Sequence, residues 1–87
     1  MSVMLTPVQD QAIAARMALI VGARTFDRLF LGIRFAETNG EFLFVFAKDE
    51  EAAAEIEDLF SLHIAIIASG ILKREVGIVV VFPKDLA

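Results

Sequence analysis

The first regular spacing of apolar and polar residues predicts a helix over residues 7–21. Thr6, Pro7 and Gln9 have the pattern of a helix start, in which threonine and glutamine form a capping box and proline takes the first helical position. Gly22 is suited to end the helix. The apolar residues that recur at helical spacing and should face the core are Ile13, Met17, Ile20 and Val21.

The middle of the chain predicts a short helix followed by a β-hairpin. Thr25 can cap a helical turn over residues 26–30. Asn39-Gly40 then stands between two apolar runs, the second of which is rich in phenylalanine. An Asn-Gly pair between two such runs is the strongest short-range signal of a β-hairpin. We therefore expect strands near residues 32–37 and 41–47.

The last third of the chain predicts a long helix and a closing strand. Asp49 opens a segment whose expected core stripe is Ile56, Phe60, His63, Ile67 and Ile71. Gly70 or Lys73-Arg74 marks its end. Residues 76–82 are largely β-branched and are stopped by Pro83, as in a strand. The predicted fold is therefore α+β, with two layers, the order α-α-β-β-α-β and a three-stranded sheet packed on helices.

Length and composition indicate one domain over residues 1–87 that relies on packing or self-association for stability. There is no cysteine, so disulfides and thiolate metal sites are excluded, and the single His63 cannot form a zinc site alone. Hydrophobic residues make up 57% of the chain, against roughly 45–50% in average soluble domains. The net charge of −4 disfavours duplex DNA as the main ligand and favours a protein partner.

The sequence gives no sign of membrane insertion. Its longest apolar run, residues 59–72, contains polar residues and is shorter than the ~20 residues that a spanning helix needs. The first five residues lack the basic region of a signal peptide, and we therefore expect a cytoplasmic protein.

The excess of apolar residues predicts an interface. Both long helices carry a second apolar stripe beside the expected core stripe, and these residues are Val8, Ala12, Ala15, Leu19, Leu59, Leu62 and Ile66. Residues 41–47 are also apolar on both sides of the strand, with phenylalanines on one side. Either the three helices cover both faces of the sheet, or the surplus marks a contact with another protein. We favour a homodimer or a stable partner.

Catalytic and cofactor patterns are not evident. The acidic residues between Asp49 and Asp58 are typical of a helix start and a solvated helix face. His63 could be a general base, but a histidine in an apolar arc is more often a core-edge residue bonded to a backbone carbonyl. No serine has the nucleophile-elbow pattern, and every glycine stands outside phosphate-binding motifs. We therefore expect no enzyme, catalytic residue, metal or cofactor.

Single-stranded nucleic acid is the alternative ligand. The residues that could form a weak basic patch are Arg16, Arg24, Arg28, Arg34, Lys73 and Arg74. Such sites usually pair a positive groove with stacking aromatics, and the phenylalanines alternate as if buried. The Gly-x-x-Gly clamp of a KH domain is also missing.

Over roughly residues 10–82 the chain resembles the amino-terminal domain of the bacterial replication initiator DnaA. The similarity rests on Val21-Gly22 before Thr25-Phe26 and Phe30, on the run from Leu43 to Asp49, and on the third-helix positions Ile56, Phe60 and Ile64. It implies a KH-like interaction domain that self-associates through its first helix and contacts a replication initiator or helicase.

Three positions depart from the resembled family. The aromatic residue that supports self-association falls on Asp10, and the exposed aromatic implicated in helicase contact falls near Glu51. The acidic residue before the second-helix phenylalanine falls on Thr25. The resemblance therefore predicts a stand-alone interaction module linked to replication, with a changed surface toward the family's usual partner.

Overall fold

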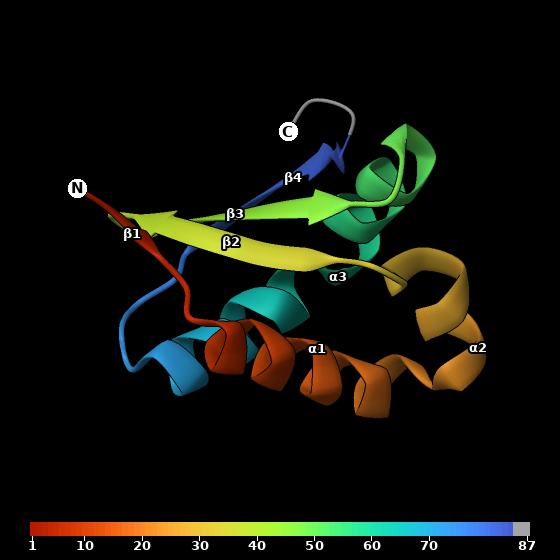
Figure 1. The fold of residues 1–87 in the computed structure, drawn as a ribbon, viewed down its shortest axis with the longest axis horizontal. Helices are drawn as coiled ribbons and strands as arrows, with labels where there is room; N and C mark the ends of the chain where they lie inside the picture. Colours follow the sequence, from red (N-terminus) through yellow and green to blue (C-terminus); the bar gives the residue numbers. More distant parts are fainter. Residues whose placement is uncertain (85–87) are drawn as a thin grey trace.

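A four-stranded mixed sheet lies over the helices in the computed structural model, which describes residues 1–84 (Figure 1). The elements are β1 (Ser2–Met4), α1 (Pro7–Val21), α2 (Ala23–Thr25), a π-helical turn (Phe26–Phe30), β2 (Arg34–Asn39), β3 (Phe42–Ala47), α3 (Glu50–Leu72) and β4 (Ile78–Pro83). The strand order is β1-β2-β3-β4. β2 is antiparallel to β1 and β3, whereas β4 is parallel to β3. The predicted α+β class is confirmed.

The prediction of three strands is wrong, because β1 precedes the first helix. Its residues Ser2, Val3 and Met4 pair with Asn39, Thr38 and Glu37 of β2. The strand has three residues, all of them exposed. It is too short to show an alternating pattern, and its strand geometry depends on the backbone bonds to β2.

The start and end of α1 follow the sequence prediction. The Thr6 hydroxyl accepts from the backbone N–H of Gln9 (3.1 Å), and the Gln9 side chain accepts from the backbone N–H of Thr6 (2.9 Å). Gly22 ends the helix with φ 85°, a conformation that favours glycine.

Thr25 does not cap a second helix as predicted. Its backbone is helical and its side chain makes no capping bond, so the chain continues from α2 into the π-helical turn. This turn buries Leu29 and Phe30, and the Phe30 ring meets the edge of Phe60 with 5.5 Å between centroids. The burial of these two side chains, rather than a cap, therefore fixes the turn.

The hairpin forms one residue later than predicted. Asn39 is the last paired residue of β2 and lies opposite Phe42, so Gly40 and Glu41 form the two-residue loop. Gly40 has φ 62°, which this type of turn requires and glycine adopts without strain. The pairing of β2 with β3 also shifts between Phe35 and Glu37, which marks a bulge at Ala36.

α3 begins at the predicted position, where the Asp49 carboxylate accepts from the backbone N–H of Ala52 (2.8 Å). It ends at Lys73, which is left-handed at φ 55°, rather than at Gly70. The buried residues of α3 are Ala52, Ala53, Ile56, Ile64, Ala65 and Ala68. The predicted core stripe is therefore partly correct: Ile56 is buried, and Phe60, Ile67 and Ile71 are half-buried against the core, whereas His63 is exposed.

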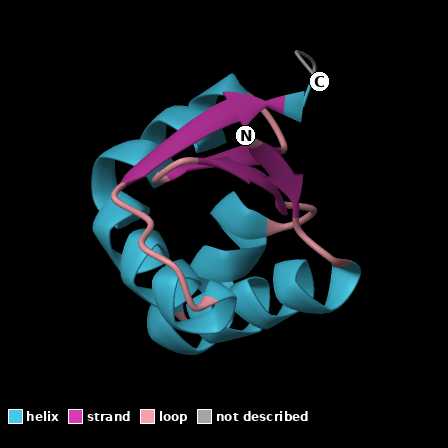
Figure 2. Cartoon of the chain, turned by 90° about the vertical axis from the view of Figure 1, so that its left-hand side faces the viewer, coloured by secondary structure: helices cyan, strands magenta, loops and turns pink. Residues whose placement is uncertain are grey.

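The core lies between the helices and one face of the sheet (Figure 2). Its largest buried apolar side chains are Phe30, Phe35, Ile13, Met17, Leu43, Ile56, Ile64 and Val45. Thr38 is the buried polar residue of this region, and its hydroxyl accepts from the Arg74 guanidinium (3.3 Å). Ile20, which was predicted to face the core, is 50% exposed.

Candidate interaction surfaces

The seven residues predicted to form an interface lie on α1 and α3, and we call them the helical surface. They are Val8, Ala12, Ala15, Leu19, Leu59, Leu62 and Ile66. The five large side chains are 55% (Leu59) to 83% (Leu19) exposed. Ala15 is also exposed, and Ala12 is half-buried. The monomer therefore leaves most of this apolar area in water.

Helix geometry explains why these residues remain uncovered. Ile13 and Met17 point from α1 into the core, and at 100° per residue Leu19 falls on the opposite side of the same helix. On α3, Ile64 faces the core while Ile66 faces away. α1 and α3 pack against each other beneath the sheet, so the helical surface extends over two neighbouring helices, and Leu62 lies beside Ile78 and Val79 of β4.

A second apolar surface covers the other side of the sheet, which the helices leave uncovered (Figures 1 and 2). We call it the open sheet face, and its residues are Phe42, Phe44, Phe46, Ile78, Val80 and Phe82. The alternation along β3 buries Leu43 and Val45 instead. The interpretation that the phenylalanines of β3 are buried is therefore wrong, since Phe42 is 40% exposed and the others are half-buried.

The phenylalanine rings on the open sheet face contact one another in a chain. Phe42 stacks on Phe44 with 6.2 Å between centroids, Phe44 on Phe82 with 6.3 Å, and Phe82 lies 5.7 Å from Phe46. The Arg34 guanidinium lies over Phe46, 5.0 Å from the ring centroid. The result is an aromatic surface with one cation, the arrangement that cation–π and stacking contacts use.

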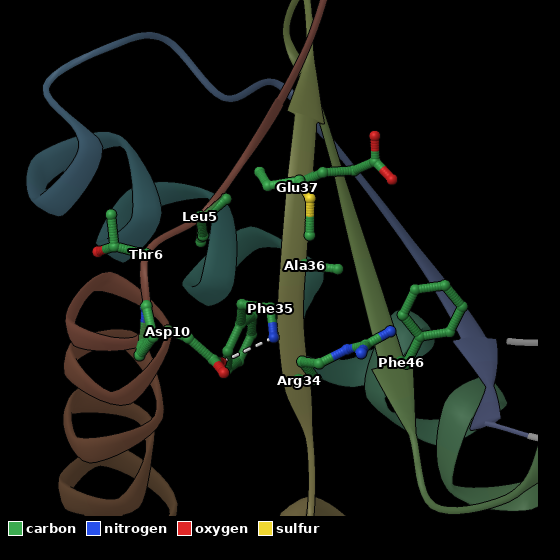
Figure 3. A pocket seen from close by; sticks show the side chains of 10 residues that line it. Leu5, Thr6, Asp10, Arg34, Phe35, Ala36, Glu37 and Phe46 are labelled. Atoms are coloured by element: carbon green, nitrogen blue, oxygen red, sulfur yellow. Dashed lines mark hydrogen bonds between the residues drawn. The ribbon is translucent and has the colours of Figure 1, made fainter.

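A shallow depression of about 430 Å³ separates the first turn of α1 from β2 (Figure 3). The Asp10 carboxylate points across it and accepts from the backbone N–H of Phe35 at 2.9 Å. Just beside this bond, the backbone N–H of Leu5 donates to the Ala36 carbonyl (2.9 Å). Asp10 therefore fixes α1 to β2 at the bulge.

Three of the arginines that were predicted to form a basic patch make contacts within the chain. Arg28, on the π-helical turn, forms a two-pronged pair with Glu55 of α3, with distances of 3.0 and 3.3 Å. The hydrogen bond to Glu55 and the charge of its carboxylate raise the pKa of Arg28. Arg74 donates to Thr38 and to the Gly40 carbonyl, whereas Arg34 lies on Phe46. These arginines thus lie in separate regions and do not form one basic groove.

His63 lies on the exposed side of α3, and the prediction of a core-edge histidine is wrong. Its ring approaches the edge of Phe60, with 6.2 Å between centroids. The error follows from the predicted core stripe, because α3 turns Ile64 and Ala65 toward the sheet instead.

Neither α1 nor α3, the two long helices of the described residues, has the length and hydropathy that a membrane crossing requires. No protein-family model matches the sequence, and no curated protein matches it significantly. The site is therefore defined by its geometry: an apolar helical surface and an aromatic open sheet face on opposite sides of a small domain.

Proposed function

We propose that the chain is a non-catalytic protein–protein interaction module that self-associates through the helical surface. The observation that supports this proposal is the exposure of five large apolar side chains of α1 and α3, at 55–83% each: Val8, Leu19, Leu59, Leu62 and Ile66. Full burial of one such side chain is worth about 1.5–3 kcal/mol. A second copy with the same surface can bury all of them at once.

The resemblance to the DnaA amino-terminal domain supports a KH-like assignment and a partner in replication. The observed order, β1-α1-α2-β2-β3-α3-β4, differs from the predicted α-α-β-β-α-β, because β1 precedes the first helix. Asp10 holds α1 to β2, and Glu51 is exposed in the first turn of α3. With these changes the module would act on an initiator or helicase by occupying an interaction surface rather than by loading a helicase in the usual way.

Size-exclusion chromatography with light scattering tests self-association. We expect a dimer at micromolar concentrations and a shift toward monomer in Leu19→Glu and in Ile66→Glu. Ala54→Glu is the matched control, since Ala54 is an exposed residue of α3 outside the helical surface and the change adds the same charge. Circular dichroism should show equal helix content in all variants. A monomer of the unaltered protein at tens of micromolar would overturn the proposal.

The replication link is tested separately by calorimetric titration with purified initiator and with purified replicative helicase. Binding to either protein that is weakened by Leu19→Glu or Ile66→Glu would support it. Self-association without binding to either would leave an interaction module whose partner lies outside replication.

The open sheet face favours a second function, binding of single-stranded nucleic acid. Phe42, Phe44 and Phe82 form a stacked series on an uncovered sheet, with Arg34 beside it. Bases stack on such rings, and arginine adds an electrostatic contribution. Titration with a labelled oligonucleotide at low and moderate salt should show micromolar, salt-sensitive binding that is lost in Phe42→Ser. Absence of binding at low salt would exclude this function.

A further inference from the structure

The two helices that carry the helical surface bear opposite charges on their exposed sides. On α1 and α2 the exposed charged residues are Arg16 and Arg24, because Asp10 is half-buried and bonded to the backbone of Phe35. α3 contains no lysine or arginine, and its exposed acidic residues are Glu50, Glu51, Glu57 and Asp58. A contact between α1 of one copy and α3 of another therefore brings opposite charges together, whereas α1 against α1 brings arginines together.

α1 and α3 run in roughly opposite directions beneath the sheet (Figure 1). Gln9, in the first turn of α1, and Leu72, the last residue of α3, line the same depression, so the start of α1 lies beside the end of α3. Both helices rise by about 1.5 Å per residue. Ten residues further along α1 and ten residues back along α3, Leu19 and Leu62 are therefore at about the same height.

We propose that two copies of this chain pack with α1 of each copy against α3 of the other, about a two-fold axis that runs along the helices between α1 and α3. The inference rests on the proposed function, because it describes how the helical surface self-associates. A rotation about this axis does not change the height of any residue along it. α1 of the second copy therefore meets α3 in the register that α1 of the same copy already has, and the two helices run in opposite directions.

The sizes of the side chains fit this arrangement. The register places Ala15 of one copy opposite Ile66 of the other, and Gly22 opposite Leu59. A small residue at the end or on the outer side of α1 thus receives a large exposed residue of α3, which lets the two helices approach closely. Both contacts occur twice by symmetry.

The charges beside these contacts fit as well. Arg24 follows Gly22 in α2 and comes to about the height of Asp58. Asp58 lies one helical turn before Leu62 and thus on the same side of α3. Neither residue forms an ion pair with another described residue. An exposed pair of this kind contributes little to affinity, but it favours α1 against α3 over the pairing of identical helices.

Charge reversal tests the arrangement. We expect Arg24→Glu and Asp58→Arg each to weaken the dimer about tenfold at low salt, because two attractive pairs become repulsive, and the combined variant to regain the original affinity. Sedimentation analysis measures the dissociation constants. Glu57→Arg is the matched control, since it makes the same charge change on the β4 side of α3, opposite Ile66, and should leave the affinity unchanged. A combined variant as weak as the single ones would overturn the pairing.

Cysteine cross-linking locates the helices independently, because the chain has no cysteine of its own. A mixture of Ala15→Cys and Ile66→Cys should be joined into a mixed dimer by a short bismaleimide. Neither variant alone should be joined, since the arrangement keeps the two α1 helices apart and the two α3 helices apart. Linkage of Ala15→Cys alone would show that α1 meets α1, and it would overturn the inference.

The outcomes separate this inference from the proposed function. If light scattering shows a dimer of the unaltered protein but the mixed cysteine variants do not link, the pairing of α1 with α3 is wrong while self-association stands. If the unaltered protein is a monomer, both are overturned. Circular dichroism checks that each variant is folded, and the cysteine pair decides the question if a charge variant is not.

Discussion

The inner and outer sides of α3 carry different sets of side chains. The fully buried residues of the inner side are Ala52, Ala53, Ala65, Ala68 and two isoleucines, and Phe60, Ile67 and Ile71 pack half-buried beside them. The outer side carries Leu59, Leu62 and Ile66, which are 55–70% exposed. Small inner residues allow close contact between helix and sheet, whereas the large outer ones contribute little to the monomer. This contrast indicates that α3 is shaped for two contacts, one within the chain and one outside it.

The largest difference is expected between two separate isoleucine-to-alanine variants, one on each side of α3. Ile64 is fully buried, so Ile64→Ala should lower the free energy of unfolding by about 2–5 kcal/mol. Ile66→Ala, two residues later and 65% exposed, should change the free energy of unfolding of the monomer by less than about 0.5 kcal/mol, measured in protein dilute enough not to self-associate. Urea unfolding followed by circular dichroism measures both. Equal losses would contradict the division of α3 into inner and outer sides.

An intermediate effect is expected on α1, whose inner side carries one polar group. Asp10→Ala leaves the backbone N–H of Phe35 without its partner and should cost about 1–3 kcal/mol. Asp10→Asn keeps a side-chain acceptor and should cost less. The same unfolding experiment compares them, with Gln11→Ala as control because Gln11 is the neighbouring exposed residue. A loss no larger than that of Gln11→Ala would mean that the Asp10 bond contributes nothing.

The smallest effect tests the outer side of α3 directly. A Cβ at Gly70 would meet nothing within 4 Å. Gly70→Ala should therefore stabilise the helix by about 0.5–1 kcal/mol. Thermal unfolding would show a raised midpoint. Both proteins should be measured at a concentration where they have the same oligomeric state. A destabilised variant would indicate that Gly70 is covered.

Local signals predicted the fold where they act over a few residues. The Thr6–Gln9 capping box, Gly22 and the Asp49 cap stand where the sequence places them. Asn39-Gly40 predicted the hairpin, but Asn39 pairs with Phe42 in the sheet, so the loop lies one residue later than predicted. These features could be predicted because each depends on bonds within a short segment.

The failures concern long-range packing. β1 exists only through its pairing with residues 37–39, which no local pattern in Ser2–Met4 reveals. The predicted core stripe of α3 follows its larger side chains and therefore includes His63. In the structure, alanines fill most of the buried positions. Thr25 was predicted to be a helix cap from its residue type. The local sequence does not show that a π-helical turn buries Leu29 and Phe30.

The candidate surfaces were predicted in part. A second apolar stripe at helical spacing located the helical surface, whose large residues are all exposed. The alternation in β3 separated Phe44 from Val45 correctly but did not show which side the helices cover. That choice depends on where α1 and α3 pack, which the strand's own sequence does not encode.

The position of β1 has a consequence for the order of folding. The β2–β3 hairpin closes through a two-residue loop, and such hairpins form in about 1–10 μs. β1 must instead find residues more than thirty positions away, and it contributes three exposed side chains when it does. We expect it to dock last and to open first, exchanging its amide protons well before the core strands. The sheet would then persist as a three-stranded intermediate whenever its amino-terminal edge is released.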